Sequence, residues 1–156
     1  MRPTRTDGVQ PGELPPLAAG RQRAAPARIL LVDDDAETRE VLRDYLLDGG
    51  HEVRVAADGS QACAALARFE ADLVITDLEM PGMDGLQLIR WLRKSRPSCA
   101  ILLVTGRTDR ELQLCRFGRL AGFECMRKPI DVDALSLTVG RLTSPGQGKA
   151  GSSAAH

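Results

Sequence analysis

The sequence has few of the features that mark membrane, secreted or nucleic-acid-binding proteins. No apolar run approaches the ~18 to 20 residues that a transmembrane helix needs, and the N-terminus lacks the apolar stretch of a secretory signal. Lysine and arginine together number 21, as do aspartate and glutamate, so the net charge gives no sign of nucleic acid or an anionic membrane as a partner. We therefore expect a cytoplasmic protein whose important charges act locally.

The cysteines and histidines of this sequence do not form the patterns that bind metals or build disulfide frameworks. The four cysteines form no CxxC pair, and His51 and His156 stand far from any ligand-like spacing. We interpret the cysteines as reduced thiols that pack in the interior.

Two terminal segments lack the periodic apolar pattern of helices and strands. Residues 1–27 hold five of the nine prolines and form a Pro/Arg/Ala-rich arm, while residues 143–156 form a Gly/Ser-rich tail. Neither buries enough apolar surface to offset the entropy of ordering, so we predict that both are disordered. The folded domain is predicted to span residues 28–142, and the tail is too short to hold an output domain.

Between residues 28 and 142, short aliphatic runs alternate with longer segments of helical period, which is typical of βα units around a parallel sheet. The predicted strands are RILLV at residue 28, HEVRVA at 51, DLVIT at 72, AILLVT at 100 and ECMR at 124. Asp35, Asp84 and Asp131 are predicted to cap helices. In the fourth helical segment, an apolar stripe around Leu114 and Phe117 is expected to lie on the sheet.

Charged and polar residues follow the predicted strands directly. Asp33 and Asp34 come after the first strand, Asp77 after the third, Thr105 at the end of the fourth and Lys128 after the fifth. Ligands of an open parallel α/β sheet bind beyond the carboxyl ends of its strands, so these side chains are expected on one rim. Two carboxylates ~5 Å apart repel by roughly 3 kcal/mol at an effective dielectric constant of about 20. A hard cation such as Mg²⁺, which binds carboxylate oxygens, would offset that repulsion.

Four motifs carry a family resemblance: LVDDD at residue 31, DLVITDLEMPGMDG at 72, LLVTG at 102 and KP at 128. In this order and spacing they resemble a response-regulator receiver domain of two-component signalling, here of the stand-alone type. The resemblance implies a flavodoxin-like α/β fold. Its doubly wound, five-stranded parallel sheet would have the strand order 2-1-3-4-5, with helices on both faces.

The resemblance also implies a role for each acid on the rim. Asp77 would accept a phosphoryl group from a histidine kinase or a histidine phosphotransfer protein. Mg²⁺ would be the cofactor, held by Asp33, Asp34, Asp77 and the main-chain carbonyl of Glu79. Such a domain catalyses only its own phosphorylation and dephosphorylation and is not otherwise an enzyme.

Thr105 and Lys128 would, by the same resemblance, bind phosphoryl oxygens, with a cis peptide before Pro129. Inward movement of the Thr105 hydroxyl would then be the signal. The surface of helix four, strand five and helix five, roughly residues 109–142, would bind an unidentified downstream protein.

One position departs from the family pattern. Receivers usually carry Tyr or Phe three residues before the lysine, and this sequence has Cys125 there; we interpret it as a small packed hydrophobe, and Phe123 stays open as a substitute. A phosphorylation-independent adaptor with a receiver fold is the main alternative function. A phosphatase of the haloacid-dehalogenase type is a further alternative, but it needs Asp-x-Asp on the first strand, whereas Asp77 follows the third and has Glu79 at plus two.

Overall fold

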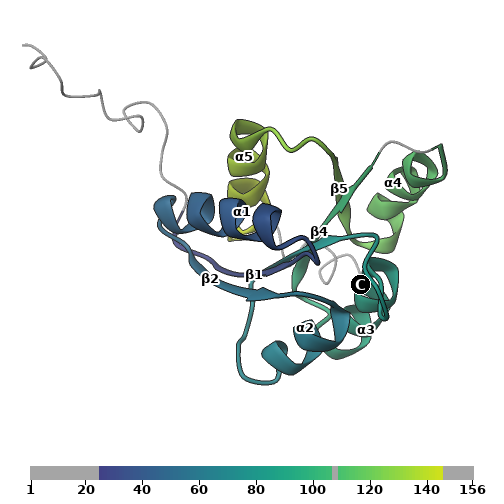
Figure 1. Cartoon of the computed structure of the whole chain (residues 1–156), viewed down its shortest axis with the longest axis horizontal. Coiled ribbons are helices and arrows are strands. Elements are labelled where there is room, and N and C mark those ends of the chain that lie inside the picture. The colour runs from purple at the N-terminus through teal and green to yellow at the C-terminus, as the bar shows by residue number, and fades with distance from the viewer. Residues whose placement is uncertain (1–24, 107–108, 146–156) are drawn as a thin grey trace, which may run out of the picture.

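The structure, a computed structural model, describes residues 25–106 and 109–145. A parallel five-stranded sheet in the order β2-β1-β3-β4-β5 forms its centre (Figure 1). The strands are β1 Arg28–Val32, β2 Glu52–Ala56, β3 Leu73–Asp77, β4 Ala100–Thr105 and β5 Glu124–Arg127. The predicted fold class and strand order are confirmed.

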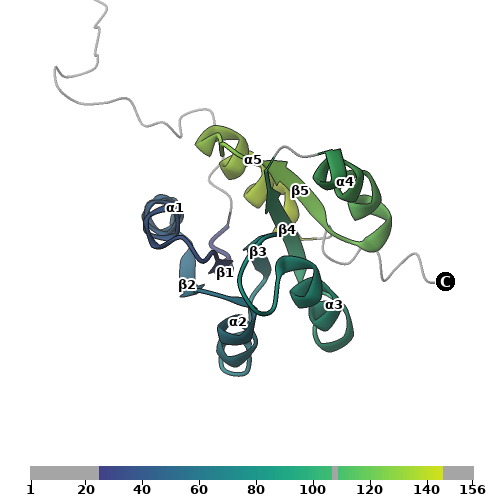
Figure 2. The ribbon, with the colours of Figure 1, turned by 45° about the vertical axis from the view of Figure 1, so that its right-hand side comes forward.

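Five helices connect and follow these strands. They are α1 Ala36–Asp48, α2 Gly59–Leu66, α3 Gly85–Ser95, α4 Asp109–Ala121 and α5 Val132–Leu142. Figures 1 and 2 show α1 and α5 on one face of the sheet and α2 and α3 on the other, with α4 beside β5. The chain order changes direction between β1 and β3, so the carboxyl ends of these two strands flank the switch point at which ligands bind in such sheets.

The core consists of two apolar layers, one on each face of the sheet. Alternate residues of a strand point to opposite faces, so Ile29 and Leu31 join the layer under α1 and α5, while Leu30 and Val32 join the layer under α2 and α3. All four are at most 1% exposed. Continuous aliphatic runs are therefore needed in the central strands, which explains why these strands are recognisable from the sequence.

Aspartates cap the helices as predicted. The side chains of Asp35, Asp84 and Asp131 accept main-chain N–H bonds at the start of α1, α3 and α5. Asp58 caps α2 in the same way and was not predicted. Each such cap contributes about 0.5–2 kcal/mol to helix stability.

The predicted apolar stripe of α4 is wrong at one position, because Phe117 is 63% exposed. The side of α4 near β5 carries Gly118 instead, and a Cβ there would lie 2.8 Å from the carbonyl oxygen of Phe123 and 2.9 Å from its ring. The ring of Phe123 thus lies against α4 at Gly118, and Phe117 lies on the outer side of the helix.

The predicted disorder of residues 1–27 and 143–156 falls mostly outside the described residues and stays a prediction. Ala27, which is described, is buried, and its carbonyl accepts a hydrogen bond from the N–H of Glu52. Within residues 25–106 and 109–145, no helix has both the length and the apolar character required to cross a membrane.

Candidate functional site

Asp33 is held at the end of β1 by three hydrogen bonds. Its N–H donates to the carbonyl oxygen of Ala56 on β2 at 3.1 Å, which extends the strand pairing by one residue. Its Oδ1 accepts from the N–H of Asp35 at 2.9 Å, and its carbonyl oxygen accepts from Nη1 of Arg39 at 2.6 Å. With 3% exposure, Asp33 is a buried carboxylate in a fixed position.

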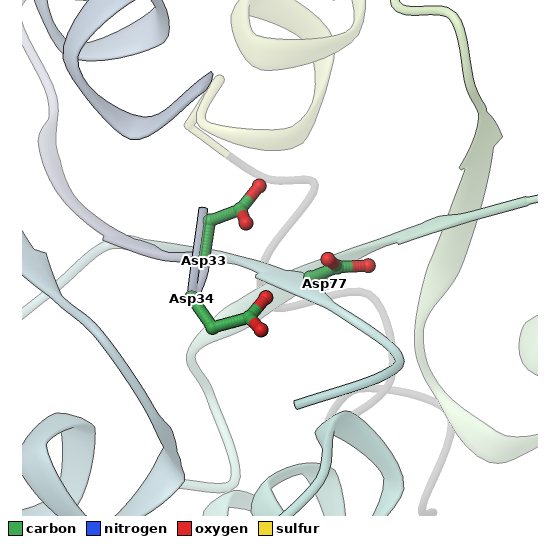
Figure 3. A group of neighbouring side chains, drawn as sticks. All are labelled: Asp33, Asp34 and Asp77. Atoms are coloured by element: carbon green, nitrogen blue, oxygen red, sulfur yellow. The ribbon is translucent and has the colours of Figure 1, made fainter. Parts of the chain in front are cut away.

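The three predicted acids meet at one edge of the sheet. Asp77 is the last residue of β3 and 8% exposed, while Asp34 is exposed. One carboxylate oxygen from each of Asp33, Asp34 and Asp77 lies within 4.8 Å of the others (Figure 3). Each pair of full charges at such a distance repels by about 3 kcal/mol at an effective dielectric constant of about 20.

The pKa of Asp33 reflects its burial and the charges around it. Burial raises it, as do the charges of Asp77 and Asp34, whereas the bond from the N–H of Asp35 and the charge of Lys128 lower it, and the net pKa lies above its usual value of 3.8. Because the folded protein holds this proton more tightly than the unfolded chain, the Asp33 contribution to stability is full below 3.8 and is lost as the pH rises through the raised pKa. A cation at the site would restore that stability.

Lys128 supplies one positive charge to the acids. Its Nζ donates to Oδ2 of Asp77 at 3.0 Å. Burial lowers the pKa of Lys128, but its bond to Asp77 and the nearby charges of Asp77, Asp33 and Asp34 raise it, with a net increase. The side chain therefore stays an ammonium group throughout the neutral range.

Thr105 lies at the same edge as the last residue of β4. It is 1% exposed, its hydroxyl donates to the carbonyl oxygen of Gly106 at 3.3 Å, and its own carbonyl accepts from the N–H of Lys128 at 2.7 Å. The expected cis peptide between Lys128 and Pro129 is present. The five rim residues predicted from the sequence are thus all at the carboxyl ends of their strands.

Glu79 in the loop after β3 and Gly85 at the start of α3 complete the description of the site. Glu79 is exposed; the role that the resemblance implies concerns its main-chain carbonyl. Gly85 packs directly against the end of β3, where an added Cβ would lie 2.4 Å from the carbonyl oxygen of Asp77. This requirement was missed from the sequence, although the glycine ends the motif MPGMDG that follows Asp77.

Comparisons with known proteins identify the family of this chain. The family model described as the response regulator receiver domain matches residues 29–139. This chain belongs to that family. Receivers are signalling modules, which also disfavours the phosphatase alternative.

Individual relatives cover the same domain. The receiver is similar to the response regulator protein FleR of Pseudomonas aeruginosa, with 43% identity over 118 residues, 74% of this chain and 24% of that protein. It is 41% identical over 103 residues to the transcriptional regulatory protein AruR of the same species, 63% of this chain and 39% of that protein. The structure of the chemotaxis protein CheY4 of Vibrio cholerae is 31% identical, with a TM-score of 0.68, 76% of this chain and 99% of that chain covered. The chain thus spans about a quarter to two fifths of the length of the first two.

The donor set of this receiver fits Mg²⁺. Hard divalent cations prefer carboxylate and carbonyl oxygens and keep several waters, and three carboxylate oxygens converge here from two strand ends. One of the acids, Asp33, is buried, and burial together with the charges of Asp77 and Asp34 raises its pKa; a bound cation would favour its charged form.

Cys125 stands at the position of the usual aromatic residue and pairs with Leu103 in the sheet register. It is partly buried and packs against the layer under α2 and α3, as predicted for a small hydrophobe. Burial, together with the hydrogen bond that its S–H donates to Cys115, raises the pKa of its thiol. Phe123 precedes β5 and lies at the amino end of that strand, whereas Thr105 is at the carboxyl end of parallel β4. Phe123 is therefore too far from Thr105 to replace the aromatic residue.

Proposed function

We propose that this receiver accepts a phosphoryl group on Asp77 from a histidine kinase or a histidine phosphotransfer protein in the cytoplasm. The observation that supports the proposal most is the position of Asp77: buried at a strand end, paired with Lys128 at 3.0 Å and within 4.8 Å of oxygens of Asp33 and Asp34. Asp33, Asp34, Asp77 and the main-chain carbonyl of Glu79 would hold Mg²⁺. When bound, the cation supplies positive charge for the phosphoryl oxygens and for the acids.

In the proposed reaction a carboxylate oxygen of Asp77 attacks phosphorus as the bond from phosphorus to the histidine nitrogen breaks, and the imidazole leaves. A carboxylate is a weak nucleophile, so positioning and charge neutralisation matter more than a base. The Lys128 ammonium, already on Oδ2 of Asp77, transfers its hydrogen bond to a phosphoryl oxygen.

The signal would begin at Thr105. Its hydroxyl now donates to the carbonyl oxygen of Gly106 at the long distance of 3.3 Å. A phosphoryl group adds strong acceptor oxygens and negative charge, so the hydroxyl would turn toward it. The shift would then reach the surface of α4, β5 and α5, where a downstream protein binds.

The test is phosphorylation with a small phosphodonor and Mg²⁺, followed by intact-mass measurement. The parent protein should gain one phosphoryl group and Asp77→Asn should gain none, because an amide is not a nucleophile. Asp44→Asn is the matched control, since Asp44 is an exposed acid of α1, and it should label like the parent. Full labelling of the Asp77 variant would refute the assignment.

A phosphorylation-independent adaptor is the second candidate, and the observation that favours it is Cys125 at the aromatic position. In that case a downstream partner would bind the parent and Asp77→Asn equally well, with or without the phosphodonor. A change in affinity that requires Asp77 would exclude the adaptor.

A further inference from the structure

Arg39 extends from α1 back to the acidic site. Its Nη1 donates to the carbonyl oxygen of Asp33 at 2.6 Å, a short distance typical of a charge-assisted hydrogen bond. That carbonyl belongs to the peptide that joins Asp33 to Asp34, two of the three clustered acids (Figure 3).

We infer that Arg39 is a positioning residue for the cation site, an inference that rests on the proposed function. Asp34 is exposed, so its carboxylate direction depends on the backbone on either side of it. On one side Arg39 fixes the carbonyl of Asp33. On the other side the N–H of Asp35 donates to Oδ1 of Asp33 at 2.9 Å. Both peptides that flank Asp34 are thus held in place, and the Arg39 side chain holds the one that joins Asp34 to Asp33.

Helix stability does not explain why a positively charged side chain stands at position 39. Arg39 lies in the first turns of α1, where the helix dipole favours negative charge. The carboxylate of Asp35 instead caps the N–H of Thr38 at 3.0 Å. The side chain of Arg39 instead donates a hydrogen bond to the segment before the helix, and that segment carries Asp33 and Asp34.

Charge and positioning predict opposite effects on cation binding, which makes the inference testable. Removal of a positive charge near the acids would tighten Mg²⁺ binding if charge were the only role of Arg39. Loss of the hydrogen bond would loosen the peptide between the two acids and weaken binding. Partners that orient a metal ligand typically contribute about 10–100-fold to metal affinity.

The experiment is a Mg²⁺ titration of the unphosphorylated parent, Arg39→Gln and Arg39→Lys by calorimetry, with the Mg²⁺-dependent rise in unfolding midpoint as a second readout. Arg43→Gln is the matched control: it removes the same charge one turn later in α1, where Arg43 pairs with exposed Asp44 at 3.2 Å. We expect Arg39→Gln to bind Mg²⁺ about 10–100-fold more weakly and Arg43→Gln to bind like the parent. Arg39→Lys should bind more tightly than Arg39→Gln, because an ammonium can still donate to the carbonyl.

Affinity in Arg39→Gln that equals or exceeds that of Arg43→Gln would overturn the inference while the proposed function stands. If Arg39→Gln does not fold, Arg39→Met, which has a long side chain without a donor, is compared with Arg43→Met. Weaker binding in Arg39→Met then supports the positioning role, and equal or tighter binding overturns it. A parent protein that binds no Mg²⁺ would instead overturn the proposed function together with this inference.

Discussion

Gly85→Ala should lower both stability and phosphorylation, although alanine is the better helix former. Gly85 is the first residue of α3, and replacing glycine by alanine in a helix interior gains about 1 kcal/mol. The added Cβ, however, would lie 2.4 Å from the carbonyl oxygen of Asp77, 2.9 Å from Cα of Leu78 and 3.1 Å from Cδ1 of Leu103. The first two are backbone atoms, so no side-chain rotation relieves the contact.

The size of the effect follows from these distances. The separation from the Asp77 oxygen must grow from 2.4 Å to at least 3.0 Å, which moves the end of β3 or the start of α3. Overpacking of this kind costs about 1–3 kcal/mol and occasionally more. Because the nearest atoms belong to the backbone, we place the cost at the upper end, about 3 kcal/mol, and a gain of at most about 1 kcal/mol in helix propensity leaves a net loss of about 2 kcal/mol. For a domain of this size that is a fall in the unfolding midpoint of roughly 8 °C.

The same movement displaces the proposed phosphoacceptor. A misplacement of about 1 Å can reduce a rate by ~100-fold, so the initial rate of labelling by a small phosphodonor at saturating Mg²⁺ should fall by about one to two orders of magnitude. Thermal unfolding and intact-mass kinetics measure the two effects.

Gly82→Ala is the control, from the loop that precedes α3. A Cβ at Gly82 meets nothing within 4 Å, but its φ of +76° is unfavourable for alanine. It should therefore lose about 1–2 kcal/mol without direct displacement of Asp77, and its labelling rate should stay near that of the parent. Labelling of Gly85→Ala at the parental rate would show that the contact does not position the phosphoacceptor.

Three further predictions concern the metal site, the switch and pH. Asp34→Ala should abolish the rise in unfolding midpoint that Mg²⁺ causes. In the parent this rise corresponds to about 2.7 kcal/mol when the Mg²⁺ concentration is 100 times the dissociation constant. Without Mg²⁺ the variant should be more stable than the parent, because one repelling charge is gone, and equal Mg²⁺ shifts in variant and parent would show that the acids are misassigned. Cys125→Tyr should increase the amide-exchange protection that α4 gains on phosphorylation, because it restores the missing aromatic side chain, and no increase would contradict this explanation. Burial lowers the pKa of His51 from 6.5, and its Nδ1 accepts a hydrogen bond from the N–H of Ala27 at 3.1 Å. The folded protein therefore favours the neutral histidine. The contribution of His51 to folding stability is full above pH 6.5 and is lost as the pH falls below 6.5 through the lowered pKa. Denaturant unfolding from pH 8 to 5 should show this loss in the parent, and an equal loss in His51→Gln would refute it.

The sequence predicts the fold well because each strand and helix carries its own local signal. Buried strands such as β1 are unbroken aliphatic runs in the sequence. Asp35 and Asp84 indicate where their helices begin, because aspartate is a preferred N-cap residue. The convergence of Asp33, Asp77 and Lys128 was also predictable, since parallel strands bring their carboxyl ends to one rim.

The features that were missed depend on particular three-dimensional contacts, which the pattern of residue types along the chain does not show. The outward position of Phe117 is set by the close approach of Gly118 to Phe123. The spacing of apolar residues in the sequence does not show where two segments pack this closely. The bond from Arg39 to the Asp33 carbonyl requires a long side chain to turn back along its helix. Gly85 is visible in the sequence as a motif residue, but only the distance to the Asp77 carbonyl explains why it is glycine.

The site is distributed over strands that are far apart in the chain. Asp33 follows β1 and Lys128 follows β5, and β4 stands between β3 and β5 in the sheet. Non-local pairings of this kind form slowly, because the chain loses loop entropy before the contacts stabilise it. A chain still under synthesis has all the acids before it has the lysine, so it cannot assemble the site until β5 has docked. Under the proposed function, only chains in which β5 has docked accept a phosphoryl group from the kinase. Shorter nascent chains neither consume phosphoryl groups nor signal.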